Sequence, residues 1–260
     1  MADTPLIELI DIKKQFGPVI ALNGVSVSVL PGECHCLLGD NGAGKSTFIK
    51  TMAGVHKPTT GEIRMNGQKV DFANPRDAMN AGVATVYQDL AMIPLMSVTR
   101  NFWMGREPRK GVWPFQFLDM DRANQVTLEE MRRMGISLRE PDQAVGTLSG
   151  GERQTVAIAR AVYFGAKVLI LDEPTSALGV RQTANVLATI DRVRKTGIGI
   201  VFITHNVRHA MAGGDRFSVL SRGKTLGTAK RGELKPEELQ DMMAGGAEMA
   251  ELSSSLGGTV

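Results

Sequence analysis

The sequence predicts an α/β fold with a central parallel sheet, and three segments support this prediction. A short strand pattern at Cys34–Leu38 runs into a glycine-rich loop and then into a helical pattern. Residues 168–171 and 198–204 are apolar runs with the length and β-branched content of buried strands. Both runs are followed by ionisable side chains. Such side chains are expected at the carboxyl edge of a parallel sheet, which is where these sheets bind ligands.

The glycine-rich loop matches the phosphate-binding pattern G-x-x-x-x-G-K-[ST] in full. Gly42 and Gly44 let successive backbone N–H groups converge at the start of the next helix, where they bind an anion. Lys45 adds a positive charge for the outer phosphates, and the Ser46 hydroxyl can ligate Mg²⁺. A plain turn would not need lysine and serine at these offsets. The sequence therefore predicts a nucleotide site made of Gly39, Asp40, Asn41, Gly42, Ala43, Gly44, Lys45, Ser46 and Thr47.

The composition is that of an ordinary globular protein. The 260 residues are 43% hydrophobic and 22% charged, enough for one large domain or two smaller ones. The net charge is only +3 and there is no long Lys/Arg run, which argues against a nucleic-acid partner.

The sequence predicts a cytoplasmic protein. It begins with neither the basic nor the apolar region of a signal peptide, and no apolar run approaches the roughly 20 residues of a membrane span. Cys34 and Cys36 stand two apart on one predicted strand, so they share a face and are too close for an easy disulfide. No second pair completes a metal site, and we interpret both as small buried side chains.

The first residues predict two strands, 6–10 and 24–30, bounded by Gly-Pro and Pro-Gly turns. Phe16 lies between them, beside a turn. Its ring either packs against the sheet or offers a surface on which an adenine base stacks.

The next segment predicts a hairpin over residues 62–70 around Asn66-Gly67, a helix over 75–81 and a buried strand over 83–87. Gln88 follows that strand directly. It is either an ordinary turn residue or a side chain that reaches a metal, and the local sequence leaves both possibilities open.

Residues 89–147 differ in character and predict a helical insertion, with helical periodicity at 121–135. Eight Lys/Arg residues balance eight Asp/Glu residues there, so the segment is not a basic DNA-binding stripe. The insertion is rich in aromatic residues, which form either a local core or an apolar docking patch for a partner. These residues are Phe102, Trp103, Trp113, Phe115 and Phe117.

The stretch 148–154 reads Leu-Ser-Gly-Gly-Glu-Arg-Gln and precedes a helical run. Ser149 and Glu152 have the spacing of a capping box. Gly150 and Gly151 weaken the first helical turn, and a cap alone would not require them. Glycines at this point allow a phosphate to approach the helix N-terminus closely.

Three ionisable residues follow the apolar strands. Asp172 and Glu173 end the first of them, and buried strands rarely end in adjacent carboxylates without a cation or a proton to move. Asp172 suits Mg²⁺ coordination through water, and Glu173 can poise a water for attack on phosphorus. His205 follows the second strand, at the edge where such folds bind ligands. Beyond it, the sequence predicts a hairpin of residues 217–220 and 224–227, a helix at 236–243 and a flexible tail at 244–260.

The order of these parts resembles the ATP-binding subunits of ABC transporters over residues 6 to about 243. The family's motifs match in sequence order: the aromatic A-loop residue, Walker A, the Q-loop, the signature, Walker B, the catalytic glutamate and the switch histidine. They fall on Phe16, residues 39–46, Gln88, residues 148–154 (with Glu152 in place of the usual Gln), Val168–Asp172, Glu173 and His205.

Finer features are similar to the carbohydrate-import branch of that family, especially residues 54–62 and 93–107. The single ATPase domain, without a C-terminal regulatory domain, resembles subunits for import of fructose or related monosaccharides. One departure is Gly179, which stands where the family's D-loop usually has Asp.

The resemblance implies an ABC-type ATPase domain over residues 1–243. A RecA-like core carries an antiparallel β subdomain, and a helical subdomain of about residues 89–160 is inserted in it. It further implies a homodimer with ATP at each interface, a polytopic membrane permease, an indirectly engaged periplasmic sugar-binding protein and a peripheral place on the cytoplasmic face of the inner membrane. Alternatives are a soluble repair or translation ATPase of the family, an exporter subunit and a P-loop small-molecule kinase.

The resemblance also implies a role for each residue in binding ATP and Mg²⁺. Phe16 stacks on adenine, Lys45 holds the phosphates and takes part in catalysis, and Asp172 supports the metal that Ser46 and Gln88 ligate. Two further residues take part in catalysis: Glu173 activates the water, and His205 contacts the γ-phosphate. The second subunit supplies Ser149, Gly150, Gly151 and Glu152 to the same ATP.

Overall fold

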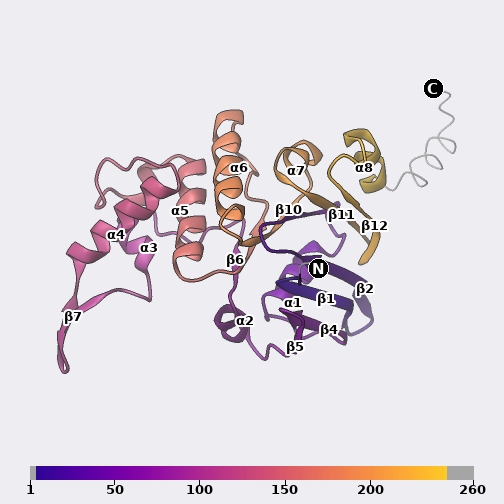
Figure 1. Cartoon of the computed structure of the whole chain (residues 1–260), viewed down its shortest axis with the longest axis horizontal. Helices are drawn as coiled ribbons and strands as arrows, with labels where there is room; N and C mark the ends of the chain where they lie inside the picture. Colours follow the sequence, from indigo (N-terminus) through magenta and orange to yellow (C-terminus); the bar gives the residue numbers. More distant parts are fainter. Residues whose placement is uncertain (1–3, 245–260) are drawn as a thin grey trace.

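The structure is a computed structural model that describes residues 4–244. Apart from Ala244, the tail predicted at 244–260 lies outside these described residues. Within them, the chain forms one six-stranded sheet, one four-stranded sheet and one two-stranded hairpin (Figure 1). The predicted α/β class is confirmed.

The six-stranded sheet positions the candidate site. Its strand order is β12-β11-β3-β10-β9-β6, and the pairs from β11 to β6 are parallel whereas β12 is antiparallel. The strands are β3 Cys34–Leu38, β6 Val83–Val86, β9 Val168–Asp172, β10 Gly199–Thr204, β11 Arg216–Ser221 and β12 Lys224–Lys230. The carboxyl ends of β3, β9 and β10 therefore lie at one edge of the sheet.

The apolar runs form central strands because both faces of the sheet are covered. Along β9, Leu169 and Leu171 pack into the core that α5 and α6 share, whereas Val168 and Ile170 pack into the core beneath the four-stranded sheet. This alternation has the period of two that a strand imposes. Strands buried on both faces read as continuous apolar runs, as the sequence suggested.

The four-stranded antiparallel sheet has the order β2-β1-β4-β5. Its strands are β1 Ile7–Phe16, β2 Val19–Val29, β4 Thr60–Met65 and β5 Gln68–Val70. The hairpin predicted around Asn66-Gly67 is confirmed, and Asn66 adopts the positive φ of 49° that such a turn needs. The predicted first two strands exist but are longer, and they meet at the pair Phe16–Val19.

The helices surround the large sheet. They are α1 Lys45–Met52, α2 Pro75–Ala81, α5 Gly150–Tyr163, α6 Val180–Arg194, α7 Val207–Gly213 and α8 Pro236–Met243. The predicted helices at 75–81 and 236–243 are confirmed with those bounds. Helices α6 and α7 were not predicted, and α6 stands beside α5 (Figure 1).

The expected helical insertion contains a feature that the sequence analysis missed. It includes α3 Val98–Trp103, α4 Met120–Arg133 and the short 3₁₀ helix Val145–Thr147, but between α3 and α4 the chain forms a hairpin of β7 Arg109–Val112 and β8 Phe115–Leu118. This hairpin projects from the left end of the molecule in Figure 1. The insertion is thus not helical throughout.

The aromatic residues of the insertion divide into two groups. Phe102 and Trp103 are buried, and the Trp103 indole N–H donates to the Ala123 carbonyl at 3.1 Å. They belong to a local core, whereas the other three lie exposed on the hairpin: Trp113, Phe115 and Phe117.

A buried histidine connects the two large sheets. Nδ1–H of His35 on β3 donates to the Ser28 carbonyl on β2 at 2.9 Å, and its Nε2 accepts from the Ser218 hydroxyl on β11 at 2.8 Å. The Ser218 oxygen in turn lies 2.7 Å from the Thr228 hydroxyl on β12. Burial lowers the pKa of His35 to about 4, so the ring is neutral near pH 7.

Cys34 and Cys36 are free and buried, as predicted. Across residues 4–244, none of the helices has the length and apolar character that crossing a membrane would require.

Candidate active site

The glycine-rich loop connects the end of β3 to the start of α1. Gly44 caps α1 with φ of 103°, and Gly39 has φ of 154°. A Cβ on Gly44 would lie 2.8 Å from the Ala21 carbonyl oxygen, and one on Gly39 would collide with the Leu220 carbonyl. Glycine is therefore required at both positions, because side chains would force the loop away from the neighbouring strands.

Lys45, the first residue of α1, folds back into the loop. Its ammonium donates to the carbonyl oxygens of Gly39 at 2.5 Å and Asp40 at 3.0 Å. Burial lowers the pKa of Lys45, while the charges of Glu173, Asp40 and Asp172 oppose that shift. A cation held inside a loop at a helix N-terminus fits the phosphate groups of a nucleotide.

Asp172 and Glu173 lie at the end of β9, as predicted. Burial raises the pKa of Asp172, and the neighbouring Glu173 raises it further, while Lys45 and Lys50 lower it. Glu173 adopts a positive φ of 49° and its backbone N–H donates to the Ile203 carbonyl at 2.9 Å. This bond to β10 holds the carboxylate at the sheet edge in a conformation that few non-glycine residues adopt.

The structure brings Glu173 and His205 together. Nδ1–H of His205 donates to Oε1 of Glu173 at 2.8 Å, and the His205 backbone N–H donates to the same oxygen at 3.0 Å. The hydroxyl of Thr204 donates to the other oxygen, Oε2, at 3.2 Å. Thr204 is buried and was not predicted, although it directly precedes His205 at the end of its strand. These donors fix the direction of the Glu173 carboxylate.

Phe16 lies at the end of β1 and is 42% exposed. Its ring meets His56 edge-on at 5.1 Å between centroids, and the Lys14 ammonium lies 4.9 Å from the ring centroid. The ring is therefore outside the core of the sheet, and an accessible aromatic surface fits a planar base.

Of the predicted metal-site residues, Ser46 and Gln88 are exposed and Asp172 is half-buried. Ser46 lies in the first turn of α1, and Gln88 lies two residues beyond the end of β6. Among residues 4–244, no group of three or more His, Cys, Asp or Glu could hold a metal ion. Magnesium does not need such a cage, because it keeps several waters and takes phosphate oxygens beside one or two protein ligands. The residues present fit Mg²⁺ only together with a phosphate ligand.

The signature segment begins α5, and its predicted capping box is confirmed. The Ser149 backbone N–H donates to Oε2 of Glu152 at 2.7 Å, and the Glu152 N–H donates to the Ser149 hydroxyl at 3.4 Å. The glycines also have a packing reason that the sequence did not reveal. A Cβ on Gly150 would lie 2.7 Å from the Leu178 side chain, and one on Gly151 would lie 3.2 Å from the Gln182 backbone oxygen.

Within one chain, the signature segment and the phosphate loop are separate. In the described part of the chain, no hydrogen bond joins residues 149–152 to residues 39–47. The structure thus unites Lys45, Asp172, Glu173 and His205 around one sheet edge and leaves Ser149 outside that group.

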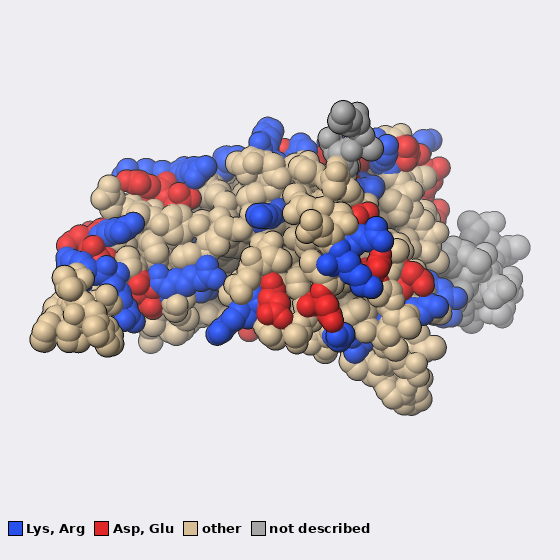
Figure 2. Space-filling model, turned by 60° about the horizontal axis from the view of Figure 1, so that its bottom comes forward, with Lys and Arg blue, Asp and Glu red and all other residues tan. Residues whose placement is uncertain are grey.

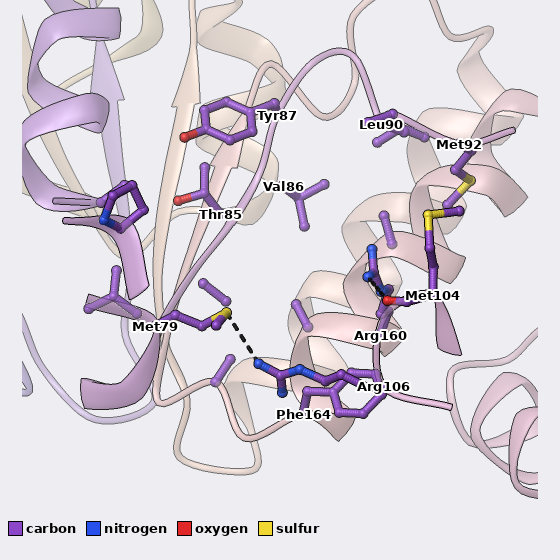
Figure 3. A pocket seen from close by; sticks show the side chains of 18 of the residues that line it. Met79, Thr85, Val86, Tyr87, Leu90, Met92, Met104, Arg106, Arg160 and Phe164 are labelled. Carbon is purple, nitrogen blue, oxygen red and sulfur yellow. Dashed lines mark hydrogen bonds between the residues drawn. The ribbon is translucent and has the colours of Figure 1, made fainter. Parts of the chain in front are cut away.

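A groove of about 410 Å³ lies between β6 and α5, beside Gln88 (Figure 3). At one end Arg106 spans it, with a guanidinium nitrogen 3.2 Å from the Met79 sulfur and the group stacked 4.7 Å from the Phe164 ring centroid. Arg160 donates to the Met104 carbonyl at 2.9 Å. Sequence reasoning missed this groove because its walls come from segments far apart in the chain.

Comparison with known proteins identifies the family. The ABC transporter family matches residues 22–176. The chain is 42% identical to the xylose/arabinose import ATP-binding protein XylG of Sulfolobus acidocaldarius, over 92% of this chain and 93% of that protein. It is 43% identical to the fructose import ATP-binding protein FrcA of Rhizobium meliloti, over 87% and 88%. It is 38% identical to the ribose import ATP-binding protein RbsA of Geobacillus kaustophilus, over 92% of this chain but 48% of that protein.

Solved structures agree on the fold. The ADP conformation of MJ1267, an ATP-binding cassette of an ABC transporter, gives a TM-score of 0.77 at 23% identity, over 92% of this chain and 95% of that one. The dimeric MJ0796 cassette gives 0.72 at 24% identity, over 88% and 100%. The chain therefore belongs to the ABC transporter family and is an ATP-binding ATPase with the fold of its cassettes. The resemblance read from the motifs is confirmed at that level.

Proposed function

We propose that this chain is the ATP-hydrolysing subunit of an importer that takes up a monosaccharide, fructose or a related sugar, through a separate membrane permease. The observation that carries the proposal is the match in length to XylG and FrcA, which are import proteins for xylose/arabinose and fructose. The chain covers about nine-tenths of each, at 42% and 43% identity.

In this proposal, the loop around Lys45 holds the phosphates of ATP and Phe16 stacks on the adenine. The amides at the N-terminus of α1 and the Lys45 ammonium supply the positive potential that phosphates require. Ser46 and Gln88 ligate Mg²⁺, and Asp172 supports it through water. The bound metal would neutralise charge on the phosphate oxygens as it develops.

Glu173 is the group that orients or deprotonates the attacking water. Its hydrogen bonds to Thr204 and His205 support this role, because a general base must be held in one direction. His205 would contact the outermost phosphate from the same edge of the sheet. Lys45 completes the catalytic group as a cation whose charge interacts with those of Glu173 and Asp172.

Two copies would form the working unit, arranged head to tail. Each ATP then lies between the phosphate loop of one copy and residues 149–152 of the other. Support comes from the absence of any hydrogen bond between these two described segments within one chain and from the capped, half-buried start of α5. We also propose one ATPase domain over residues 1–243, with the helical subdomain at about 89–160.

The groove beside Gln88 is the proposed docking site for the permease. It lies between the sheet that binds ATP and the inserted segment, so closure of one against the other would change its shape. The chain would then act at the cytoplasmic face of the inner membrane, with a periplasmic sugar-binding protein engaged only through the permease and no nucleic acid involved.

The variant Glu173→Gln tests the assignment of the catalytic base. It keeps the size and polarity of the side chain but cannot accept a proton, so we expect ATP binding to persist, turnover to fall on the order of 10²–10³ and the dimer to accumulate. Phosphate release and light scattering in the presence of ATP measure these effects. Normal turnover in this variant would show that Glu173 is not the base.

Recovery of the tagged chain from gently solubilised native membranes tests the importer assignment. We expect a polytopic permease to copurify, and uptake of labelled fructose, ribose or xylose by cells lacking the chain then identifies the sugar. Recovery only from the soluble fraction, with ribosomes or nucleic acid, would favour the non-transport alternative and leave the ATPase assignment in place. Copurification with a permease that moves its substrate outward would favour an exporter.

A further inference from the structure

The β7–β8 hairpin exposes an unusual amount of apolar surface. Four of its apolar side chains range from 67% exposed for Phe117 to 81% for Val112, with Trp113 and Phe115 between them. Every residue of both strands is exposed. Large exposed apolar patches in globular proteins mark sites of interaction.

The strand register divides the hairpin into two unlike faces. Val112 pairs with Phe115 and Lys110 pairs with Phe117, so these four side chains share one face. The other face carries Arg109, Gly111, Gln116 and Leu118. One face is therefore apolar towards the end of the hairpin, and the other is mostly polar.

The hairpin also changes from charged to apolar along its length. Arg109 and Lys110, the charged residues of residues 109–118, stand at the base, whereas Trp113 and Phe115 stand at the end. Figure 2 shows the tip at the lower left of the molecule without charged side chains, and charged side chains lie directly above and beside that tip. Cations at one level and aromatic rings beyond them match the order of headgroups and acyl chains in a bilayer.

The hairpin attaches to the rest of the chain at its base. The Lys110 ammonium lies 3.2 Å from Oδ2 of Asp121 and 3.6 Å from Oδ1 of Asp119, and Leu118 lines a small cavity beside Trp103. A two-stranded hairpin is marginally stable in water by itself. Contact of its apolar face with another apolar surface would therefore stabilise it.

We propose that the end of this hairpin inserts into the interfacial layer of an anionic lipid bilayer. Tryptophan and phenylalanine partition favourably into that layer, and Arg109 at the base would meet lipid headgroups of opposite charge, whereas Lys110 is already paired with Asp119 and Asp121. Asp119 and Asp121 follow β8 at the base, and positions 109–118 contain no acidic residue, so the end of the hairpin carries no negative charge into the interface. An uncharged aromatic end above the Arg109 cation thus favours a lipid interface over a second copy or a protein groove as the cover.

The position of the hairpin agrees with this partner. Arg106, three residues before β7, lines the groove beside Gln88, and Met104 lines both that groove and the small cavity under the hairpin. In Figure 1 the hairpin and α2, whose Met79 lines the groove, both lie along the lower edge of the molecule. Nearness of the hairpin to the membrane rests on the proposed function, in which the groove receives a membrane permease.

The two tryptophans provide a direct test, because one lies at the end of the hairpin and the other is buried. Trp103→Phe leaves Trp113 as the sole tryptophan, and Trp113→Phe leaves Trp103. With vesicles of equimolar phosphatidylcholine and phosphatidylglycerol, we expect the emission of Trp113 to shift to the blue and to be quenched by brominated acyl chains. The emission of Trp103 should change in neither respect.

Vesicle flotation of the otherwise unmodified chain provides a second test that does not depend on Trp103. Replacing Trp113, Phe115 and Phe117 together with serine should lower the partition coefficient by at least about tenfold, which is about 1.4 kcal/mol. Leu226→Ser, which removes an exposed apolar side chain from β12 at the other end of the molecule, is the matched control and should bind as the unmodified chain does. ATPase activity in solution should be unchanged in all of them.

Several results would overturn the proposal. These are no binding of the unmodified chain to anionic vesicles, an unchanged partition of the triple variant, or a loss of self-association in the triple variant without any vesicle binding. The tests use only protein and lipid, so they are independent of the importer assignment. If the chain does not bind vesicles but a permease copurifies with it, only the hairpin proposal fails. If the chain binds vesicles but no permease copurifies, only the importer proposal fails.

Discussion

At the scale of single residues, the carboxylate of Glu173 is held by more groups than its own backbone provides. Thr204 reaches one oxygen and His205 reaches the other, and both residues come from the end of β10. The Thr204 hydroxyl also accepts the Asn206 backbone N–H at 3.1 Å, which leaves its proton for Glu173. Thr204 is therefore a positioning residue for the proposed base.

We expect Thr204→Val to lower kcat for ATP hydrolysis by about tenfold with little change in KM. Valine keeps the branched shape but removes the donor, and a hydrogen bond to a charged group contributes about 1.5 kcal/mol or more. Steady-state phosphate release at several ATP concentrations measures both constants.

Thr204→Ser is the control, because it keeps the hydroxyl and should restore most of kcat. A Thr204→Ser variant as slow as Thr204→Val would show that packing of the methyl group, and not the hydrogen bond, is the function of this side chain.

At the scale of elements, the start of α5 serves two purposes. Glu152 and Ser149 satisfy each other's backbone N–H groups, and the guanidinium of Arg153 donates to the Leu148 carbonyl at 2.6 Å. The same turn is the proposed contact to the ATP of a second copy. Its rigidity follows from local bonds and does not depend on that copy.

Loss of the capping box should therefore reduce stability before it affects anything else. We expect Glu152→Ala to lower the free energy of unfolding by about 1 kcal/mol and Tm by about 2–4 °C. Thermal unfolding followed by circular dichroism measures the change. Glu152→Gln retains an oxygen acceptor, as in the family's usual signature, and should unfold within about 1 °C of the unmodified chain. An equal loss in both variants would argue that the carboxylate charge at the helix N-terminus is the important factor.

Elements with strong local signals were predictable from the sequence. Asn66-Gly67 predicted the hairpin, and Asn74 before Pro75 caps α2 with two side-chain hydrogen bonds. Helix α6 begins at Val180 after Gly179, which provides no side-chain cap, so it carried no comparable start signal. Four-residue strands joined by Trp113-Pro114 likewise lack the Asn-Gly turn that marks a hairpin.

The candidate site likewise contains residues that local sequence predicts and contacts that it does not. The phosphate loop, Asp172, Glu173 and His205 were predictable because each follows directly from a strand. The hydrogen bond from Thr204 to Glu173 and the stacking of Arg106 on Phe164 depend on tertiary packing, and no local pattern encodes them. The exposure of Trp113 against the burial of Trp103 was undecidable for the same reason.

At the scale of the whole molecule, His35 joins strands from both large sheets through Ser28 and Ser218. Its Nε2 accepts a hydrogen bond, so protonation would break that connection. Burial is the main reason that the pKa of His35 falls to about 4; Arg216 lowers it further and Glu33 partly opposes the shift. In the unfolded chain the ring regains a pKa of about 6.5.

Because the folded state holds the lower pKa, the unfolded state binds the proton more readily between about pH 6.5 and about 4. The stabilising effect of a neutral His35 is therefore complete above pH 6.5 and is lost as the pH falls through this window, by about 3 kcal/mol in full. Urea unfolding at intervals of pH should show this decrease, with a smaller decrease in His35→Gln. Identical pH profiles for the two proteins would rule out His35 as the source.

The burial of both sulfhydryl groups has a practical consequence. The sequence contains two cysteines, and Cys34 and Cys36 are each 0% exposed, with burial raising the pKa of the Cys36 thiol well above its usual value. Thiols that are buried and protonated react slowly with maleimides. A cysteine introduced on the surface would then be the preferred labelling position, so fluorophores or spin labels could report on distances within the working assembly without first removing the native sulfur atoms.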